Sequence, residues 1–230
     1  MRECPAIIAA LPREVKALVR GWQEHRLPGK ITAYTNDFAV VVCAGMGAER
    51  ATLAVQAALS LKPVTSLLSV GLAGACDPDL HVSDIVRAGV VIDARTGERF
   101  SNSLFNQTLI TSSTVAGSKE KQRLYASYQA SAVDMEAATV ARLAEAHHLS
   151  FRAIKSISDE ATFEMQELAQ FATADGQFRE AAFAAHSAFR PRLWPKLFAL
   201  AGNSKRAVQA LTTELESQLN WYRQQDKEIC

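Results

Sequence analysis

Short apolar runs alternate along this chain with segments whose apolar residues recur at helical spacing. Residues 5–11, "PAIIAAL", form an unbroken apolar run typical of a strand that is buried on both faces. In the following "PREVKALVRGW", Val15, Leu18 and Val19 share one helical face. The pattern therefore predicts a strand over 5–11 and a helix over 12–22.

The next part of the chain repeats this order. "ITAYTNDFAVVVCAGMG" predicts two strands joined by a turn at Asn36 and Asp37, with the second strand ending at the glycines of "GMG". The residues that follow, "AERATLAVQAALSL", have apolar positions at helical spacing and predict a helix over 48–61.

The second half of the chain continues the alternation. "TSLLSVGLAGA" and "SDIVRAGVVIDA" predict two strands with Gly71 and Gly74 at the break between them. "ASAVDM" and "SFRAIKSISDEA" predict two more, separated by the helical segment "EAATVARLAEAHH". This order predicts an α/β domain with a central mixed, mostly parallel sheet flanked by helices. Since ligands bind at the carboxyl ends of such strands, "LPRE", "GMGAER", "GLAGA", "VDMEA" and "ISDEA" are expected to share one rim.

Composition narrows the class of protein. The 230 residues, with no linker-like break before Gly176, predict one main domain over 1–176 and a C-terminal helical tail over 177–230. A hydrophobic share of 48% and a net charge of +1 are typical of a soluble globular protein and argue against a general nucleic-acid binder. The cysteines have no CxxC spacing, and no signal peptide or membrane-spanning run is found, so a cytoplasmic location is expected.

Two glycine-rich turns could approach an anion. "GMGAER" leads from a strand into a helix, so the N–H of Gly47 and the side chain of Arg50 could bind phosphate. "GLAGA", with Gly71 and Leu72, could likewise border a phosphate or water pocket. Both turns are equally well explained as tight connections without a ligand.

Carboxylates at the same rim suggest chemistry. Glu136 in a first helical turn could accept hydrogen bonds from paired hydroxyls, such as those of a ribose, or could satisfy free N–H groups of its helix. Asp159 could be a general acid or a helix cap, and Glu14 a base or a solvated residue. Met135 is equally explained as core filler.

No other catalytic motif competes with these carboxylates. The histidines and cysteines show no metal-ligand spacing, and the sequence contains neither GxSxG nor a P-loop. No cofactor or metal is therefore expected, although phosphate stays open as a co-substrate.

The order of "IIAALPREV", "VVVCAGMGAERA", "SVGLAGACDPDLHVSDIV" and "AVDMEAATVARLAEAHHLSFRAIKSISDEA" resembles the purine nucleoside phosphorylase superfamily, and most closely its nucleosidase branch. The resemblance covers residues 6–162 and implies a single three-layer domain. That branch cleaves methylthioadenosine and S-adenosylhomocysteine. The pair "VDMEA" and "ISDEA" is its most specific part.

The resemblance implies a role for each rim residue. Glu136 would bind the ribose hydroxyls with Met135 packed against the sugar, Asp159 would protonate the purine N7, and Glu14 would activate water. Ser158 and Asp134 would support the base pocket.

Three residues depart from the pattern of that branch. Asp134 stands where the branch usually has Glu, Leu72 where it has Ser, and Lys155 where it commonly has Arg. These departures bear on the water or phosphate pocket and on the identity of the substrate.

The sequence is also similar to the hopanoid-associated phosphorylases of the same superfamily, which are held to remove adenine from adenosylhopane. This likeness lies in "GLAGACDPDLHVSDIV", "VAGSKEKQRLYASYQASAVDMEA" and the late "RPRLWPKLFAL". The basic and aromatic residues of "FRPRLWPKLFALAGNSKR" suit a membrane surface or a lipid-like ligand, although a helix packed on the domain or on a second subunit explains them as well.

The expected function is cleavage of the N-glycosidic bond of an adenine-type nucleoside, with hydrolysis favoured over transfer to phosphate. The nucleoside would carry a modified 5′ group, as adenosylhopane does, and the loop over 96–107 is expected to border that group. Phosphorolysis, a uridine-type phosphorylase and a non-catalytic nucleoside binder are the alternatives. The family resemblance further implies a homodimer, and the tail suggests a peripheral membrane contact.

Overall fold

The computed structural model describes residues 4–102, 104–164 and 194–228. Its strands are β1 (Pro5–Ala9), β2 (Gln23–Leu27), β3 (Ile31–Thr35), β4 (Val40–Cys43), β5 (Ser66–Ala75), β6 (Ile85–Asp93), β7 (Arg99–Ser101), β8 (Gln107–Thr111), β9 (Ala132–Asp134) and β10 (Ser150–Asp159). Its helices are α1 (Pro12–Val15), α2 (Ala48–Leu61), α3 (Ser118–Tyr128), α4 (Ala137–Ala146) and α7 (Trp194–Glu228).

All the described strands join one mixed sheet. The order is β10-β6-β8-β9-β5-β1-β4-β3-β2, with β7 paired to β6 and β10 also paired to β5. Within the described residues, five of the ten pairings are parallel, including those that β5 makes with β1 and β10. The predicted mixed α/β architecture is therefore confirmed.

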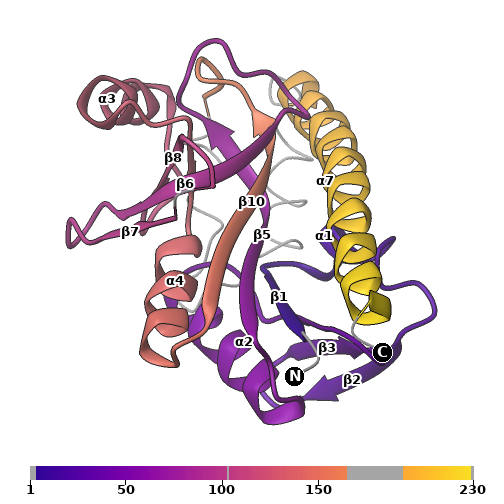
Figure 1. Ribbon diagram of the computed structural model, residues 1–230. Coiled ribbons are helices and arrows are strands. Elements are labelled where there is room, and N and C mark those ends of the chain that lie inside the picture. Colours follow the sequence, from indigo (N-terminus) through magenta and orange to yellow (C-terminus); the bar gives the residue numbers. More distant parts are fainter. Residues whose placement is uncertain (1–3, 103, 165–193, 229–230) are drawn as a thin grey trace.

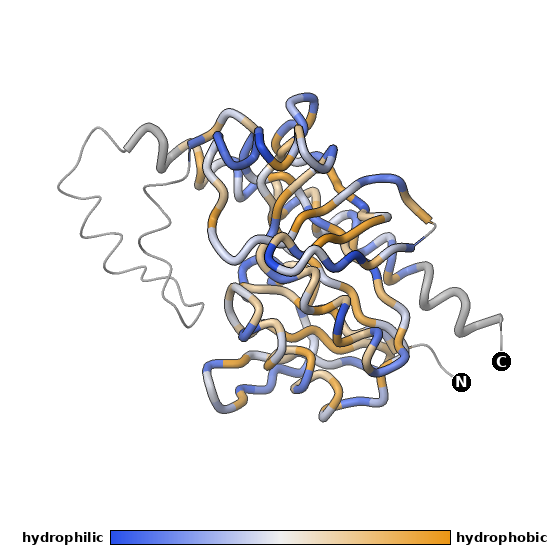
Figure 2. Tube along the Cα trace, turned by 90° about the vertical axis from the view of Figure 1, so that its left-hand side faces the viewer, coloured by the Kyte–Doolittle hydropathy of each residue, from blue (hydrophilic) through white to orange (hydrophobic). Residues whose placement is uncertain are grey.

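Helices cover both faces of the sheet (Figure 1). α2 and α4 pack on one face, while α1 and α7 pack on the other, with α7 running along β10 and β5. β1 shows why its apolar run is unbroken: Ala6 and Ile8 join the cluster beneath α2, whereas Ile7 and Ala9 join the cluster beneath α7. Hydrophobic stretches accordingly run through the interior in Figure 2, and the outer turns are largely hydrophilic.

Several element boundaries differ from the prediction. The first helix ends at Val15 because the chain continues in turns to Gly21, whose φ of 82° is left-handed. The break expected at Gly71 and Gly74 does not occur, since β5 runs through both glycines and ends at Ala75. β2, β7, β8 and α3 were not predicted, because none has an apolar run or a strong apolar stripe of its own.

The C-terminal helix α7 is part of the core. Ala207, Leu211, Leu215 and Leu219 are buried, and the last three pack in the cluster shared with β1, β4 and β10. The ion pair between Arg87 on β6 and Glu214 on α7, with Nη2 and Oε2 2.5 Å apart, adds a polar tie. Helix α7 thus packs against the sheet, mainly on β10 and β5.

The domain boundary predicted at residue 176, and the aromatic and basic residues before 194, lie outside the described residues. Among the described helices, none is long and apolar enough to cross a membrane.

Candidate active site

A cavity of about 710 Å³ opens at the carboxyl ends of β1, β5, β9 and β10, with α3 and α7 completing its wall. The cavity therefore lies at the edge of the sheet where the carboxyl ends of the strands were expected to form a site. Of the residues singled out from the sequence, those that line the cavity are Glu14, Leu72, Asp134, Met135, Glu136, Ser158 and Asp159. Gly47, Arg50 and Gly71 lie outside its lining.

Glu14 is a buried carboxylate held by the main chain. Its Oε2 accepts hydrogen bonds from the N–H groups of Ala10, at 3.2 Å, and Leu11, at 3.0 Å. Burial raises the pKa of the Glu14 carboxyl, and these donors offset the effect only in part. A carboxylate with a raised pKa takes up a proton more readily, as a general base must.

Gly71 makes room for this carboxylate. A Cβ at position 71 would lie 3.3 Å from Glu14 Oε2, and the φ of 139° at this glycine strains any other residue. Gly71 therefore shapes the site without lining the cavity.

Glu136 precedes α4 and is fixed from a distant part of the chain. The N–H of Gly47, at the start of α2, donates to Glu136 Oε1 at 2.7 Å. Burial and then the charge of Asp134 raise the pKa of Glu136 to about 7. The N–H expected to bind phosphate is thus occupied by a carboxylate.

Asp134 and Lys155 form a buried ion pair beneath Glu136. Lys155 Nζ lies 2.8 Å from Asp134 Oδ2, and both side chains are at most 1% exposed. Asp134 also accepts from Thr111 Oγ1, at 2.7 Å, and from the N–H of Ala137, at 2.9 Å, which starts α4. Burial alone would lower the pKa of Lys155, but the facing carboxylates raise it above its usual value. Two of the departures from the nucleosidase pattern therefore meet in one ion pair.

Arg50 does not contact the cavity. Its Nε donates to the main-chain oxygen of Ala44, and its Nη2 donates to that of Gly29 at 2.6 Å. Arg50 is 8% exposed, and its guanidinium joins the loop before β3 to the loop after β4. The hydrogen bonds of Arg50 thus go to main-chain oxygens, and the residue lies outside the cavity lining.

Asp159, at the end of β10, is paired with a lysine from α3. Lys121 Nζ forms an ion pair with Asp159 Oδ2 and donates to the main-chain oxygen of Glu160 at 2.9 Å. Ser158 Oγ donates to Asp159 Oδ1 at 2.7 Å. Lys121 and Asp159 are 1% and 4% exposed, and both line the cavity.

Sequence reasoning missed Lys121, because "SKEKQRLYASY" has the charge of a solvated helix. A signal was nevertheless present: Lys121 lies three residues before Leu124, so the two share a helical face, and Leu124 is fully buried. A charge on the apolar face of a helix needs a partner, and here the partner is Asp159.

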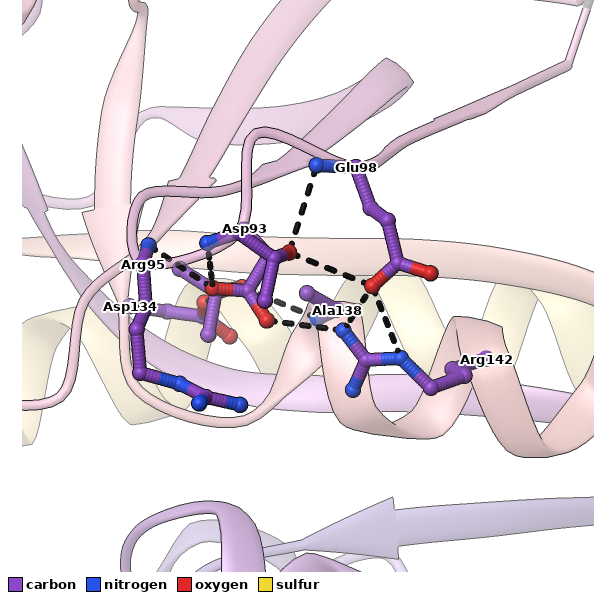
Figure 3. A network of polar contacts seen from close by, with 8 residues as sticks. Asp93, Arg95, Glu98, Asp134, Ala138 and Arg142 are labelled. Carbon is purple, nitrogen blue, oxygen red and sulfur yellow. Dashed lines mark hydrogen bonds and ion pairs between the residues drawn. The ribbon is translucent and has the colours of Figure 1, made fainter.

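The loop expected to border the 5′ group packs elsewhere. Figure 3 shows Arg142 on α4 contacting Asp93 and Glu98 at the turn between β6 and β7; its Nη2 lies 2.7 Å from Asp93 Oδ2 and 2.5 Å from Glu98 Oε2. The described residues within 96–107 do not line the cavity, so this part of the prediction is wrong for the single chain. Leu200, Ser204 and Val208 of α7 line it instead.

The described residues that line the cavity include four carboxylates and three basic side chains, Arg13, Lys121 and Lys205. Asp134 and Asp159 are paired with buried lysines, whereas Glu14 and Glu136 have main-chain N–H donors and no ion pair among the described residues. Two unpaired carboxylates at one wall can deprotonate a nucleophile or stabilise a cation.

The comparisons with known proteins bear on the family and on the fold. The model of the phosphorylase superfamily matches residues 6–110 and 107–190. The comparison with curated proteins gave no match.

Solved structures share the fold. The chain superposes on the 5′-methylthioadenosine/S-adenosylhomocysteine nucleosidase of Helicobacter pylori with a TM-score of 0.72 and 16% identity, covering 96% of this chain and 99% of that one. Futalosine hydrolase of H. pylori gives a TM-score of 0.71 and 16% identity over 95% and 97%. The Streptococcus pneumoniae MTA/SAH nucleosidase gives 0.60 and 26% identity over 70% and 87%. The family match extends over most of the sequence, and this chain therefore belongs to the phosphorylase superfamily.

Proposed function

We propose that this protein hydrolyses the N-glycosidic bond of a purine nucleoside. The observation that carries the proposal is the convergence of Glu14, Glu136 and Asp159 on one cavity, from three separate strand ends. The nucleosidases and the hydrolase that share the fold support the same reaction class.

The reaction needs three separate groups. Breaking the bond between the sugar C1′ and the base N9 leaves positive charge on the ribose and negative charge on the base. Ionised Glu136 would accept hydrogen bonds from the ribose diol and stabilise that positive charge. Glu14 would take a proton from water as its oxygen bonds to C1′.

The leaving base needs a proton at N7, and the Lys121–Asp159 pair is proposed to supply it. The transferable proton of this ion pair is on Lys121 Nζ, which Asp159 and the Glu160 carbonyl hold at the cavity wall. The base then departs neutral, and the water proton stays on Glu14.

The two groups expected to bind phosphate are engaged elsewhere, which favours hydrolysis over phosphorolysis. The Gly47 N–H donates to Glu136, and Arg50 binds main-chain oxygens. A phosphate dianion placed near Glu14 and Glu136 would be repelled by several kcal/mol, roughly, in a partly dry site.

The α7 wall supports a substrate with an extended 5′ group. Leu200 and Val208 of α7, like Met46 and Leu72, are apolar residues of the cavity lining. A cavity of about 710 Å³ suits a ligand larger than a bare nucleoside. We therefore propose an apolar 5′ substituent lying against α7.

The test is base release from purine nucleosides, followed by chromatography, with the variants Glu14→Gln and Asp159→Asn. Each should lower kcat by about 100-fold or more, because Glu14→Gln removes the proposed base and Asp159→Asn removes the partner that holds the proton donor Lys121 at the cavity wall. Asp79→Asn, an exposed aspartate outside the cavity, is the matched control and should keep wild-type activity. Near-normal turnover by Glu14→Gln would contradict the role of that residue as the base.

A further inference from the structure

We propose that Thr111 is a positioning residue that keeps the Glu136 carboxylate free to bind the ribose. The inference rests on the proposed function and deepens it, because it names a residue that acts on the substrate only through another side chain. Thr111 lies at the end of β8, is 7% exposed and is not part of the cavity lining.

The sheet places Thr111 beside the segment that carries Glu136. β8 and β9 are parallel neighbours, and Thr111 is paired with Asp134 at the end of β9. The N–H of Ser112 donates to the main-chain oxygen of Asp134 at 2.8 Å, which supports this register. The side chain of Thr111 therefore meets the chain two residues before Glu136.

The hydroxyl of Thr111 is both a donor and an acceptor. Its Oγ1 donates to Asp134 Oδ1 at 2.7 Å and accepts from the N–H of Ala138 at 2.9 Å. Asp134 Oδ2 in turn accepts from the N–H of Ala137 at 2.9 Å. These bonds hold the main chain in place on both sides of Glu136.

This arrangement releases Glu136 from capping its own helix. Glu136 is the N-cap residue of α4, yet its side chain makes no capping hydrogen bond. The first two N–H groups of the helix are bound by Asp134 and Thr111 instead. The carboxylate of Glu136 can therefore line the cavity.

Loss of the hydroxyl should draw Glu136 back to the helix. Without Thr111 Oγ1, the buried N–H of Ala138 loses its acceptor, and such a loss is costly. A side chain at the N-cap position can bind the N–H of the second or third residue of a helix, and Ala138 is the second residue of α4. A Glu136 carboxylate that caps α4 no longer binds the ribose diol.

A merely structural role for Thr111 predicts a different result. A smaller amount of folded protein lowers the rate with every substrate by the same factor. Misdirection of Glu136 instead lowers the rate most for a ribonucleoside, because a 2′-deoxynucleoside lacks one of the two hydroxyls that Glu136 is proposed to bind. The ratio of kcat/KM for the two sugars therefore separates the two roles.

The experiment measures kcat/KM for adenosine, inosine and their 2′-deoxy analogues with the full-length protein. Thr111→Val keeps the shape of the side chain and removes its hydroxyl. It should lower kcat/KM for the ribonucleosides by about tenfold, roughly the value of one hydrogen bond to a charged group, and that for the deoxynucleosides by less than about threefold. Each ratio is compared with that of wild type, so the different intrinsic reactivities of the two sugars cancel.

Three further variants test the hydroxyl. Thr111→Ser retains it and should keep the wild-type ratio within about twofold, whereas the weaker S–H donor of Thr111→Cys should lower the ratio. Thr111→Cys also serves as the test if Thr111→Val does not fold. Thr108→Val, on the same strand and outside the cavity lining, is the matched control and should behave as wild type.

A double-mutant cycle tests whether Thr111 acts through Glu136. In a Glu136→Ala background, Thr111→Val should change the ratio for the two sugars by less than about twofold, because the side chain that it positions is gone. An undiminished effect in that background would overturn the inference.

The remaining outcomes separate the inference from the proposed function. Cleavage with an equal loss for both sugars in Thr111→Val, or with no loss, would overturn the inference and leave hydrolysis standing. If wild type cleaves no nucleoside, the proposed function is contradicted, and calorimetry with inosine and 2′-deoxyinosine then measures the ratio as affinities. A preference for the ribonucleoside that Thr111→Val abolishes would support the inference in that case, and the absence of any such preference in wild type would overturn it.

Discussion

The carboxylates of the site differ in their hydrogen-bond and ion-pair partners, and we assign their chemical roles from this difference. Glu14 and Glu136 accept from main-chain N–H groups, whereas Asp134 and Asp159 accept from buried ammonium groups. The first pair can change protonation state without breaking an ion pair. In the second pair, Asp134 and Asp159 hold the ammonium groups of Lys155 and Lys121 in position.

A first prediction concerns Glu136 and pH. Because the folded protein raises the pKa of this carboxyl from 4.5 to about 7, the residue costs stability as pH rises from about 4.5 to about 7. Below that range, both states bind the proton and the cost vanishes. Glu136→Gln lacks the cost, so its free energy of unfolding should exceed that of wild type by about 1–2 kcal/mol more at pH 8 than at pH 5.

Chemical denaturation at the two pH values measures this difference. The expected difference in the free energy of unfolding is smaller than the full pKa shift of Glu136 implies, because solvent that enters the cavity can solvate the carboxylate. Glu145→Gln, an exposed position on α4, is the control and should show no pH-dependent difference. If Glu136→Gln also showed no pH-dependent difference from wild type, the pKa of Glu136 would be ordinary and the prediction would be contradicted.

A second prediction concerns the buried pair of Lys155 and Asp134. Lys155→Met removes one charge and leaves the other buried without its partner, which should lower the free energy of unfolding by about 3–5 kcal/mol. Adding Asp134→Asn removes the orphaned charge and should restore at least half of that loss. A double variant less stable than the single one would mean that the pair is not coupled in this way.

The sequence located most candidate residues but not their partners. "VDMEA" and "ISDEA" have strand-end positions that can be read from the apolar runs before them, so Glu136 and Asp159 could be placed on one rim. The partners come from segments 38 and 89 residues away, as in Lys121–Asp159 and Gly47–Glu136. No local pattern encodes such contacts, and Arg50 was misjudged for the same reason.

At the scale of elements, burial on both faces decided what could be predicted. β1, β4, β5 and β10 are buried over most of their length, and β1, β4 and β5 consist mainly of apolar residues, so these strands were found. β2, with the sequence "QEHRL", pairs only with β3 and is largely exposed. Charged edge strands of this kind have no periodicity that separates them from loops.

α7 gives a third prediction, because it is both core and cavity wall. Val208→Phe enlarges a side chain at the wall and should raise KM for a nucleoside with a bulky 5′ substituent by about tenfold, since overpacking costs about 1–3 kcal/mol. KM for the unsubstituted nucleoside should change by less than about threefold, because this substrate has no 5′ substituent that the larger side chain could press against.

Thr213→Phe, on the exposed side of the same helix, is the matched control for steady-state kinetics with the two substrates. Equal effects of Val208→Phe on both substrates would place the 5′ group away from α7.

At the scale of the whole molecule, the sheet gathers residues from distant parts of the chain. The parallel neighbours β1, β5 and β10 bring Glu14, Leu72 and Asp159 to one end of the sheet, while α3 and α7 close the cavity from two other directions. The strand-and-helix order alone predicted this arrangement. The helix α3 was not predicted, and the C-terminal tail was predicted to be helical but not to line the cavity, because what identifies the cavity-facing residues of both helices is tertiary contact.

The most direct test of hydrolysis at Glu14 is the identity of the sugar product. Inosine and 5′-alkylthio purine nucleosides are incubated with the protein with and without phosphate, and the products are separated. We predict free base and free sugar in phosphate-free buffer, at a rate that phosphate does not increase. A strict phosphate requirement with sugar 1-phosphate as product, or no base release from any purine nucleoside, would contradict the account.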